Sequence, residues 1–522
     1  MVLLLALLAL WGGWFIYRTS FVSSEGRRFF CLFDDAMISM TYARNLVEGY
    51  GLNWARGGEP VEGFTHPLWL LPMIAANALP LPLEVRSLPV QLLSLLLLAA
   101  SAVAARKLVL DHFSTERTAT GMPAAVLTAF YYPLSYWALM GMETGLQALL
   151  AILAVQLALD VTEAGCDRHL ALWLVCAAAC LLRMDMLLMV LAVQAYVLIR
   201  TGAGRSWRLG LALFLVITLG YGLFRWLYFQ DVLPNTYYLK LTGVAFSARL
   251  LKGLSMLGTF LRDHLLVLLP VGLGVVPLMR RHPRLVLPVS LFVLYCAYSV
   301  YVGGDAWDLE LNVRANRYIA FVMPQVFVLL NALINRVPAA AARYAAPAVT
   351  GAALLLLNGL WLSEKAGDNW QNLLVTIRPP AVGGHQAVMD QLHILQRRVE
   401  PGAKVASTWA GIPSYFTDYQ MIDVLGYNDR RIARMESQVE LNEDQYLHFR
   451  PGHNKWNLGL LMKRRRPDAF FQIWGVSTPE ELARRMTRAG YRNIDGFWLH
   501  KDSPRIRWPE GREPVRKRKA RR

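Results

Sequence analysis

The sequence predicts a multi-spanning α-helical membrane protein that ends in a soluble α/β domain. Hydrophobic residues make up 55% of the 522 residues and charged residues only 17%, whereas about a quarter of the residues in soluble chains are charged. The apolar residues come in long blocks, about eleven of which approach the roughly 20 residues that cross a bilayer as a helix. Beyond residue 362 the blocks stop, and shorter strand and helix patterns take their place.

Each apolar block is expected to form one span. The candidate spans lie near residues 2–20, 87–105, 120–139, 142–160, 169–183, 184–199, 209–229, 264–279, 285–302, 318–335 and 344–362. Pro67–Pro80 is also apolar, but it is short and bracketed by prolines, so we expect a re-entrant or interfacial helix there. The first block has no basic segment before it and no small-residue cleavage motif, so we expect a retained span and not a signal peptide.

The basic residues of the short loops predict the orientation of the spans. They collect in four loops: Arg106, Lys107 and Arg117; Arg200, Arg205 and Arg208; Arg280, Arg281 and Arg284; and Arg336 with Arg343. With about eleven spans, all four loops fall on one side, which the positive-inside rule assigns to the cytoplasm. The C-terminal domain is then extracytoplasmic. The net charge of +17 reflects this topology, and because no basic face carries stacking aromatics, nucleic acid is not an expected partner.

Polar residues gather in the loops that alternate with the basic ones. They are Asp34, Asp35, Arg44, Glu62 and His66 in the first loop, then Glu143, Arg183, Asp185, Asn235, Tyr238, Lys240, Asp305, Arg314 and Arg317. Each could be a helix cap or half of a salt bridge, and residues 35–47 look like a short helix with Asp34 or Asp35 as its N-cap. Because all of them fall on one face, and charges at a membrane edge usually serve function, they predict a site.

The residue types predict the chemistry of that site. Five cations are suited to a phosphate: Arg44, Arg183, Lys240, Arg314 and Arg317. Six carboxylates could accept a hydroxyl proton or bind sugar hydroxyls: Asp34, Asp35, Glu62, Glu143, Asp185 and Asp305. Nearby aromatic residues offer either sugar-stacking surfaces or an interfacial belt. A phosphate site beside a polyol site at a membrane surface implies a lipid-linked sugar.

Several motifs, in order, carry a resemblance to a known family. They are FDDAMISMTYARNLVEGYGLNW, PVEGFTHPLW, GMET, LPNTYYLK, VGGD, VASTWAGIPSYFTDYQMIDVLGYND and PGHNKWN. In these motifs the chain resembles the multi-spanning GT-C glycosyltransferases, which use polyprenyl-phosphate sugars and carry an acidic pair in the first outer loop. More narrowly, it resembles the terminal arabinofuranosyltransferases of the actinobacterial cell wall and the related enzyme that glycosylates type IV pilins. The resemblance covers most of the chain.

The resemblance implies a GT-C fold and a decaprenyl- or undecaprenyl-phosphate D-arabinofuranose donor. It implies transfer to a hydroxyl of a cell-envelope glycan or pilin-like protein, outside a bacterial inner membrane. By position, Asp35 or Asp34 would be the catalytic carboxylate, with Asp35 favoured. The donor phosphate would be held by Arg183, Lys240, Arg314 and Arg317, and the sugar by Glu62, Glu143, Asn235 and Asp305. The small outer domain departs from the cell-wall branch and leaves a protein or a smaller glycan open as the acceptor.

Residues 363–503 are predicted to form the soluble domain. Strands are expected at residues 403–409, 420–425, 469–474 and 496–500, and helices at 384–399 and from the capping box at Thr478 to about residue 489. Within this domain His453 and Lys455 could contact donor or acceptor, or be solvated loop residues. The tail, residues 504–522, is strongly basic, as in disordered segments and in those that contact anionic lipids.

Three alternatives stay open on the sequence alone. The acidic residues could hold Mg²⁺, Mn²⁺ or Ca²⁺, although no spacing demonstrates a metal site. A GT-C transferase that uses another polyprenyl-linked sugar would need the same site architecture. A transporter or flippase for a lipid-linked sugar would instead predict charges near mid-membrane, interrupted helices and an internal repeat; we find no repeat, and the ionisable residues cluster at one surface.

Overall fold

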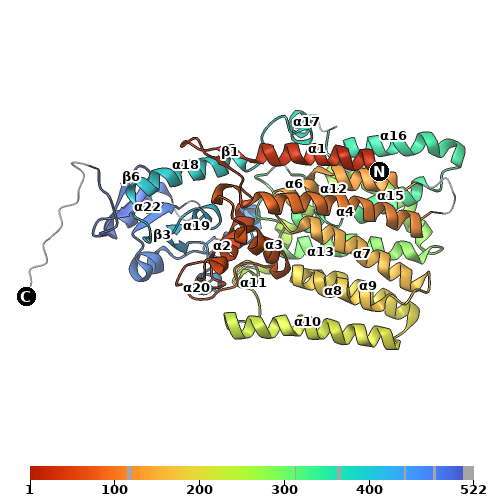
Figure 1. Ribbon diagram of the computed structural model, residues 1–522, viewed down its shortest axis with the longest axis horizontal. Coiled ribbons are helices and arrows are strands. Elements are labelled where there is room, and N and C mark those ends of the chain that lie inside the picture. The colour runs from red at the N-terminus through yellow and green to blue at the C-terminus, as the bar shows by residue number, and fades with distance from the viewer. Residues whose placement is uncertain (115–119, 312, 361–365, 440–442, 474–477, 510–522) are drawn as a thin grey trace, which may run out of the picture.

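The computed structural model describes the chain except for residues 115–119, 312, 361–365, 440–442, 474–477 and 510–522. A bundle of long helices fills one part of the molecule, and a smaller domain built around a β-sheet stands on one end of it (Figure 1). We call the end of the bundle that carries this domain the domain end. Most of the predicted basic tail lies outside the described residues.

Within the described residues, eight helical segments are long and apolar enough to cross a membrane. They contain α1 (Val2–Thr19), α4 (Leu88–His112), α7 (Thr144–Thr162), α9 (Leu187–Thr201), α10 (Arg205–Phe229), α12 (Phe246–Met279), α13 (Val286–Val302), and the pair α14 (Arg317–Ala320) and α15 (Met323–Ile334). Three shorter apolar helices are α3 (Pro67–Ala78), α8 (His169–Leu182) and α16 (Ala339–Leu357). Each predicted span coincides with a helix or a pair of helices, so the chain is a multi-pass membrane protein.

The span predicted at residues 120–139 is broken into two helices, α5 (Met122–Phe130) and α6 (Tyr132–Leu139). Tyr131 is extended between them, and Pro133 supplies no amide for the helix. Asn358 satisfies the interrupted backbone: its Oδ1 accepts from the Tyr132 amide at 2.8 Å, and its Nδ2 donates to the Phe130 carbonyl at 3.1 Å. A break inside an apolar region is tolerated when a neighbouring helix bonds the freed groups.

The four basic loops meet at the end of the bundle opposite the domain end. Arg284 lies 5.9 Å from the centre of the Phe113 ring, and the Thr120 amide donates to Asn335. Arg200 lies 5.7 Å from the ring of Tyr196, which is also close to Arg284. The loops therefore share one side, as the charge pattern predicts; that this side is the cytoplasm stays a prediction.

Helix α3 lies at the domain end, beside α2 (Asp34–Val47) (Figure 1). With 12 residues, α3 is about 18 Å long and too short to cross a bilayer. The Trp69 indole in α3 donates to the Gly141 carbonyl at 2.9 Å, which ties the helix to the turn before α7. The structure thus agrees with the expectation that this segment is not a full span.

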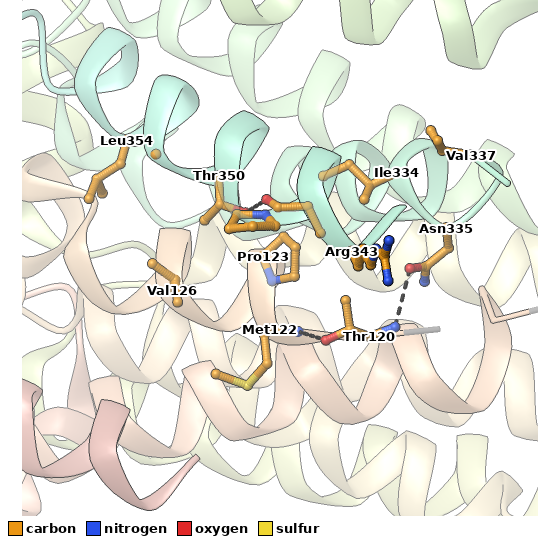
Figure 2. A pocket seen from close by; sticks show the side chains of 13 residues that line it. Thr120, Met122, Pro123, Val126, Ile334, Asn335, Val337, Arg343, Thr350 and Leu354 are labelled. Atoms are coloured by element: carbon orange, nitrogen blue, oxygen red, sulfur yellow. Dashed lines mark hydrogen bonds between the residues drawn. The ribbon is translucent and has the colours of Figure 1, made fainter. Parts of the chain in front are cut away.

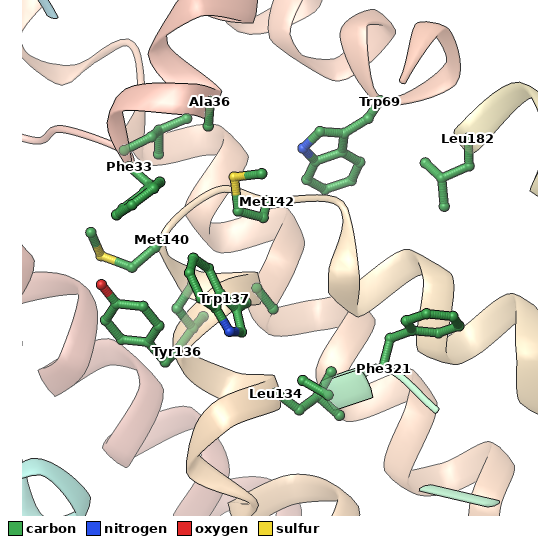
Figure 3. Close-up of a cluster of buried hydrophobic side chains, with 14 of the residues drawn as sticks. Phe33, Ala36, Trp69, Leu134, Tyr136, Trp137, Met140, Met142, Leu182 and Phe321 are labelled. Carbon is green, nitrogen blue, oxygen red and sulfur yellow. The ribbon is translucent and has the colours of Figure 1, made fainter. Parts of the chain in front are cut away.

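A cluster of buried aromatic and methionine side chains supports the start of α2 (Figure 3). The ring of Phe33, just before the helix, meets the ring of Trp137 edge-on with centroids 5.5 Å apart. The Phe33 amide also donates to the Met140 carbonyl at 2.8 Å. Large buried aromatics contribute strongly to packing, so the first turn of α2, with its two aspartates, rests on a rigid floor.

The soluble domain is built on a five-stranded sheet with the order β4-β3-β5-β7-β6. The strands are β3 (Lys404–Ser407), β4 (Gln420–Asp423), β5 (Ala469–Gln472), β6 (Tyr491–Ile494) and β7 (Phe497–His500). Strand β3 runs parallel to β4 and β5, with Val405 opposite Met421 and Ala469; β7 runs antiparallel to β5 and β6. The four predicted strands are confirmed, and only β6, whose residues Arg492 and Asn493 are exposed, was missed.

Short elements complete the domain and its connections. Its helices are α18 (Val382–Arg398), α19 (Ile412–Tyr415), α20 (Arg430–Ala433), α21 (Leu458–Leu460) and α22 (Pro479–Arg488), with a π-helix η5 (Leu461–Arg465) and a 3-10 turn η4 (Glu443–His448). Helix α17 (Ala366–Leu374) lies beside α1 of the bundle (Figure 1), where the Trp11 indole donates to the Leu373 carbonyl at 2.7 Å. Within the rest of the chain lie β1 (Phe21–Val22), β2 (Arg28–Phe29), α11 (Asn235–Leu241) and the 3-10 turns η1 (Leu83–Val85), η2 (Met184–Met186) and η3 (Pro283–Leu285). The predicted cap of α22 is confirmed, because the Thr478 hydroxyl accepts from the Glu481 amide.

Candidate functional site

A charged pocket lies at the domain end of the bundle, between α2, the loop before α3, α11 and the soluble domain. Its polar and ionisable side chains are Asp35, Ser39, Thr65, His66, Glu143, Arg183, Thr236, Lys240, Arg317 and Tyr427. Six of these, from five separate segments of the chain, were predicted as site residues: Asp35, His66, Glu143, Arg183, Lys240 and Arg317. The fold therefore brings the predicted polar loops together around one cavity.

Asp35 forms the acidic centre of the pocket and is held by Arg317. The distance from Arg317 Nη2 to Asp35 Oδ2 is 2.9 Å, and Arg317 Nε lies 2.7 Å from Asp305 Oδ2. Burial acts to raise the pKa of Asp35, but Arg317 and then Lys240 outweigh it and lower the pKa below its ordinary value. Asp35 is therefore ionised at neutral pH, with Asp305 behind it to fix the arginine.

A second ionic group forms another wall. Arg183 Nη1 donates to Glu143 Oε1 at 2.6 Å, and Arg183 Nε donates to Asp185 Oδ1 at 2.8 Å. Glu143 is fully buried at the start of α7. Two carboxylates thus surround one guanidinium, so this group brings no net positive charge to the cavity, although Arg183 keeps a planar donor surface.

His66 lies between Ser39 of α2 and Glu143. Ser39 Oγ lies 2.8 Å from His66 Nε2, and His66 Nδ1 lies 3.3 Å from Glu143 Oε2. Burial lowers the pKa of His66, with Glu143 opposing and Arg183 reinforcing that effect. Neutral His66 therefore orients Ser39, which stands one helical turn after Asp35 on the same face of α2.

A less polar groove opens beside this pocket. It is lined by η2, α11 and α13, including Met184, Tyr237, Leu241 and Val302. The pocket and the groove share the side chains Thr65, Arg183, Thr236 and Lys240. The two cations of this set therefore stand at the boundary between the charged pocket and a less polar groove, which Asp185 also lines.

Lys240 is the cation at this boundary without a carboxylate partner among the described residues. Its Nζ lies 6.0 Å from the centre of the Tyr427 ring, which closes the pocket from the soluble domain. A partly buried ammonium that makes no ion pair gains most when a ligand supplies a negative charge in direct contact. Lys240 thus marks the best position for a ligand anion.

Asp34 does not line the pocket and does not cap α2. The N-cap of α2 is Phe33, without a side-chain hydrogen bond, which contradicts the expected capping role of either aspartate. Instead the Asp34 carboxylate accepts from the amides of Gly411 and Ile412, at 3.2 and 2.8 Å, and so joins the bundle to α19 of the soluble domain. Burial outweighs the Ile412 amide and, reinforced by Asp35, raises the pKa of Asp34 to about 7.

This raised pKa predicts a pH-dependent attachment of the soluble domain. Because the folded-state pKa lies above the ordinary value of 3.8, the docked state binds a proton more tightly than the undocked state. The stabilisation is complete at low pH and is lost as pH rises through about 7. We expect the melting temperature of the purified protein to fall between about pH 4 and pH 7 and to level off above, and Asp34→Asn to flatten that fall. If the melting temperature of Asp34→Asn falls with pH as steeply as that of the wild type, the pH dependence comes from other groups.

Other predicted residues are engaged in structural contacts outside the pocket. Arg44 pairs with Glu48 and Asp418 at 2.7 Å each, and donates to the carbonyls of Tyr415 and Thr417. It holds the soluble domain and does not reach the pocket. The physical reason is that α2 is amphipathic, and Arg44 lies more than two turns beyond Asp35, where the helix faces the soluble domain.

Arg314 and Glu62 also bind protein partners. Arg314 Nη1 donates to Asp263 Oδ2 in α12 at 2.9 Å. Glu62 is buried against α10, where Arg225 Nε and the Tyr221 hydroxyl donate to it at 2.5 and 2.7 Å. Neither side chain lines the pocket, because each pairs with a polar group that projects from an apolar helix.

The remaining predicted residues hold the soluble domain near the pocket. Asn235 donates to two backbone carbonyls of the domain, Lys455 Nζ donates to the carbonyls of Tyr238 and Ala433, and the Tyr238 hydroxyl donates to Asp231. His453 packs between Trp307 and Tyr427 and lies close enough to Asp35 to affect its charge. Burial lowers the pKa of His453 to about 4, so the ring is neutral.

The position of Arg44 gives a prediction on stability. Arg44→Met leaves two buried carbonyls without their donor and removes one of the two arginines that bond Glu48 and Asp418, and we expect a loss of about 3 kcal/mol in the free energy of unfolding. Chemical denaturation followed by tryptophan fluorescence measures it. The matched control is Arg56→Met, because Arg56 bonds the same Glu48 and Asp418 from a more exposed position; we expect a loss of at most about 1 kcal/mol. Equal losses would contradict the anchoring role of Arg44.

Sequence reasoning missed several residues that shape the site. Tyr427 comes from the soluble domain and reaches the pocket only through long-range folding, for which the sequence carries no local signal. Thr236 and Ser39 lie inside motifs used for the prediction, but small hydroxyls have many structural roles. Arg225 did carry a usable signal, because a lone arginine in an apolar span requires a polar partner.

A metal site is not apparent among the described residues, which contain no group of three or more His, Cys, Asp or Glu side chains placed to hold an ion. The carboxylates at the pocket are each engaged by a cation: Asp35 by Arg317, and Glu143 by Arg183. This donor set does not fit a divalent ion, since bound arginines compete with it. The divalent cation considered from the sequence stays untested, and no step is assigned to it.

A larger and mainly apolar cavity lies at the opposite end of the bundle, between α5, α15 and α16 (Figure 2). Pro123, Ile334 and Leu354 line it, with Asn335 and Arg343 as polar members. None of its described lining residues is a carboxylate, so it offers no proton acceptor. The charged pocket at the domain end is therefore the candidate site.

The fold and the pocket define a multi-pass membrane protein with a buried ionic site under a soluble domain. A protein-family model described as a domain of unknown function (DUF8728) matches residues 377–512. A comparison with curated proteins finds no match.

Solved structures with a similar fold include ArnT from Cupriavidus metallidurans in two states. The apo structure is 14% identical, covers 90% of this chain and 92% of that chain, and gives a TM-score of 0.53. The structure bound to undecaprenyl phosphate is 14% identical, covers 95% and 97%, and gives a TM-score of 0.54. The predicted fold class, a multi-spanning helical membrane protein with a C-terminal α/β domain, is confirmed, and its fold resembles that of ArnT.

Proposed function

We propose that this protein is a GT-C glycosyltransferase that moves a sugar from a polyprenyl phosphate to an acceptor hydroxyl. The observation that carries the proposal is the placement of Lys240 and Arg183 between the carboxylate-containing pocket and the less polar groove. A polyprenyl-phosphate sugar has the same order of parts: an apolar chain, a phosphate and a polyol. The similarity to ArnT, solved with undecaprenyl phosphate, supports the lipid class.

The shared cations are proposed to bind the donor phosphate. Lys240 has no carboxylate partner among the described residues, so it can neutralise the phosphate without breaking an ion pair. Arg183 adds planar N–H donors and is kept in place by Glu143 and Asp185. As the bond from the sugar to the phosphate breaks, negative charge grows on the leaving oxygen, and preorganised cations at that point lower the barrier.

Asp35 is proposed to receive the proton of the acceptor hydroxyl. Arg317 and Lys240 keep it ionised, and it stands in the pocket on the rigid first turn of α2. The acceptor oxygen bonds to the anomeric carbon, the bond from that carbon to the phosphate oxygen breaks, and the proton moves to Asp35. Polyprenyl phosphate leaves through the less polar groove. The protein mainly orients the two substrates and balances charge.

The finer assignments extend the proposal. The donor sugar is D-arabinofuranose, which is supported by the family resemblance of the FDDAMISM, PVEGFTHPLW and LPNTYYLK motifs. The acceptor is a cell-envelope glycan or a pilin-like protein. The reaction takes place on the extracytoplasmic face of the inner membrane, which is supported by the four basic loops at the opposite end of the bundle.

A donor panel tests this proposal. Purified protein is incubated with radiolabelled polyprenyl-phosphate arabinofuranose, aminoarabinose or mannose, and membrane extract serves as the acceptor. We expect label from the arabinofuranose donor in the extract, at a rate at least about tenfold above the others. Transfer only from a different polyprenyl-phosphate sugar would support the glycosyltransferase proposal and overturn the assignment of arabinofuranose as the donor sugar. No transfer from any of the three would contradict the proposed function.

A further inference from the structure

The soluble domain contains a second, basic cleft that the transfer reaction does not use. One wall is the segment Leu461–Arg466, the other is α22, and His500 with Ser503 lies at the base. Four cations line it: Lys463, Arg466, Arg485 and Arg488. The two walls come from sequence positions about 20 residues apart and face each other across an open space, so the cations converge and are not spread along a single solvated helix.

Four cations and two carboxylates, Asp468 and Asp502, line the cleft, so its positive charge is only partly compensated. Lys463, Arg466 and Arg488 form no ion pair with any residue in the described part of the chain, and Arg485 pairs with the exposed Glu481. The nearby carboxylate of Asp468 is already occupied, because it accepts from the Lys404 amide at 2.8 Å and from the Ser503 hydroxyl at 2.7 Å. The cleft is therefore suited to an anion.

The backbone of the first wall is unusual. The π-helix Leu461–Arg465 ends at Arg466, which adopts a left-handed conformation with φ 45° and ψ 66°. This conformation is strained for a non-glycine residue, and single π-turns and such strained residues concentrate at functional sites. The Arg466 amide donates to the Leu461 carbonyl at 2.8 Å, so the strained end is fixed. The wall is thus built to present Lys463 and Arg466 and is not a relaxed surface loop.

One continuous segment joins this wall to the transfer pocket. His453 packs against Tyr427 of the pocket, Lys455 donates to the Tyr238 carbonyl beside Lys240, and Arg465 pairs with Asp429 at 2.8 Å. From residue 453 to residue 466 the chain can span at most about 45 Å. The cleft and the pocket are therefore at most about 45 Å apart, a distance that an extended ligand chain can span.

We propose that this cleft binds an anionic glycan, a saccharide chain that carries phosphate or uronate groups, and thereby recruits the acceptor. Helix α22 and strand β6 lie at the end of the molecule remote from the helix bundle (Figure 1), which separates the cleft from lipid headgroups. The inference rests on the proposed function, because it names the chemical class of that reaction's acceptor. Arginine and lysine suit both phosphate and carboxylate, so the chemistry they share is the anionic group.

The test measures binding to the full-length protein in detergent at about 0.15 M salt, where weak surface attraction is screened. The probes are a phosphodiester-linked mannan, an oligogalacturonate, a neutral dextran and poly-glutamate, each fluorescently labelled. The test variant is Lys463→Gln/Arg488→Gln. The matched control is Arg464→Gln/Arg484→Gln, which removes the same charge from the same two elements at positions that do not line the cleft.

We expect saturable binding of the mannan, the oligogalacturonate or both, and which one binds identifies the anionic group. The test variant should weaken this binding at least about tenfold, or 1.4 kcal/mol, and the control less than about twofold. The proposal is overturned if both variants weaken glycan binding equally, or if neutral dextran binds as tightly as the anionic glycans. It is also overturned if only poly-glutamate binds, or if no probe binds saturably. This binding test contains no donor and is independent of transfer. Glycan binding here, together with no transfer in the donor panel, would contradict the proposed function and leave the cleft assignment intact.

Discussion

Replacing Asp35 by asparagine is expected to lower sugar transfer by about 10³-fold or more. The amide cannot take the acceptor proton, and Arg317 loses the carboxylate that it contacts at 2.9 Å. The initial rate of transfer by purified protein measures the effect. Binding of undecaprenyl phosphate should remain within about threefold of wild type, since the phosphate is assigned to Lys240 and Arg183.

The neighbouring aspartate provides the control for this experiment. Asp34→Asn alters a carboxylate that bonds the soluble domain, so we expect lower stability and a rate within about tenfold of wild type. The opposite pattern, with activity kept in Asp35→Asn and abolished in Asp34→Asn, would reverse the assignment of the catalytic carboxylate.

Lys240→Gln should lower kcat/KM for the donor by about 10²–10³-fold, because it removes a preorganised charge from the leaving phosphate. Lys240→Arg should restore a substantial part of that loss, since the charge returns with a different shape. The measurement is steady-state kinetics with varied donor, together with the affinity for undecaprenyl phosphate, which should fall in parallel.

Arg314→Gln is the matched control for the lysine. Both cations were predicted to bind phosphate, but Arg314 is bonded to Asp263 away from the pocket. We expect this variant to lose stability and to keep the donor KM within about twofold of wild type. A KM for Arg314→Gln that rises as much as that for Lys240→Gln would show that the contacts described for Arg314 are not those of the donor complex.

The helical part of the fold could be predicted because membrane spans have a strong and local signal. A run of about 20 apolar residues is typical of a membrane helix and rare in soluble domains, and each predicted span has a helical counterpart. The break between α5 and α6 was not predicted, because it depends on Asn358, more than 200 residues further along the chain, which bonds the interrupted backbone. Strand β6 was missed because two of its four residues are exposed and polar.

The candidate site could be predicted in part, for a similar physical reason. Topology alone places Asp35, Glu143, Arg183, Lys240 and Arg317 at one end of the bundle, and the pocket contains them all. Topology does not say which polar residues face the cavity and which face another protein group. Arg44 and Glu62 differ from Asp35 in their partners, Asp418 and Arg225, and such pairings arise only when distant segments fold together.

The most direct test follows the donor lipid itself in proteoliposomes that contain purified protein. We predict that one polyprenyl phosphate is released for each sugar transferred, and that Asp35→Asn stops both together. Passage of intact donor across the bilayer, with no polyprenyl phosphate released and no dependence on Asp35, would identify a transporter and contradict the glycosyltransferase account.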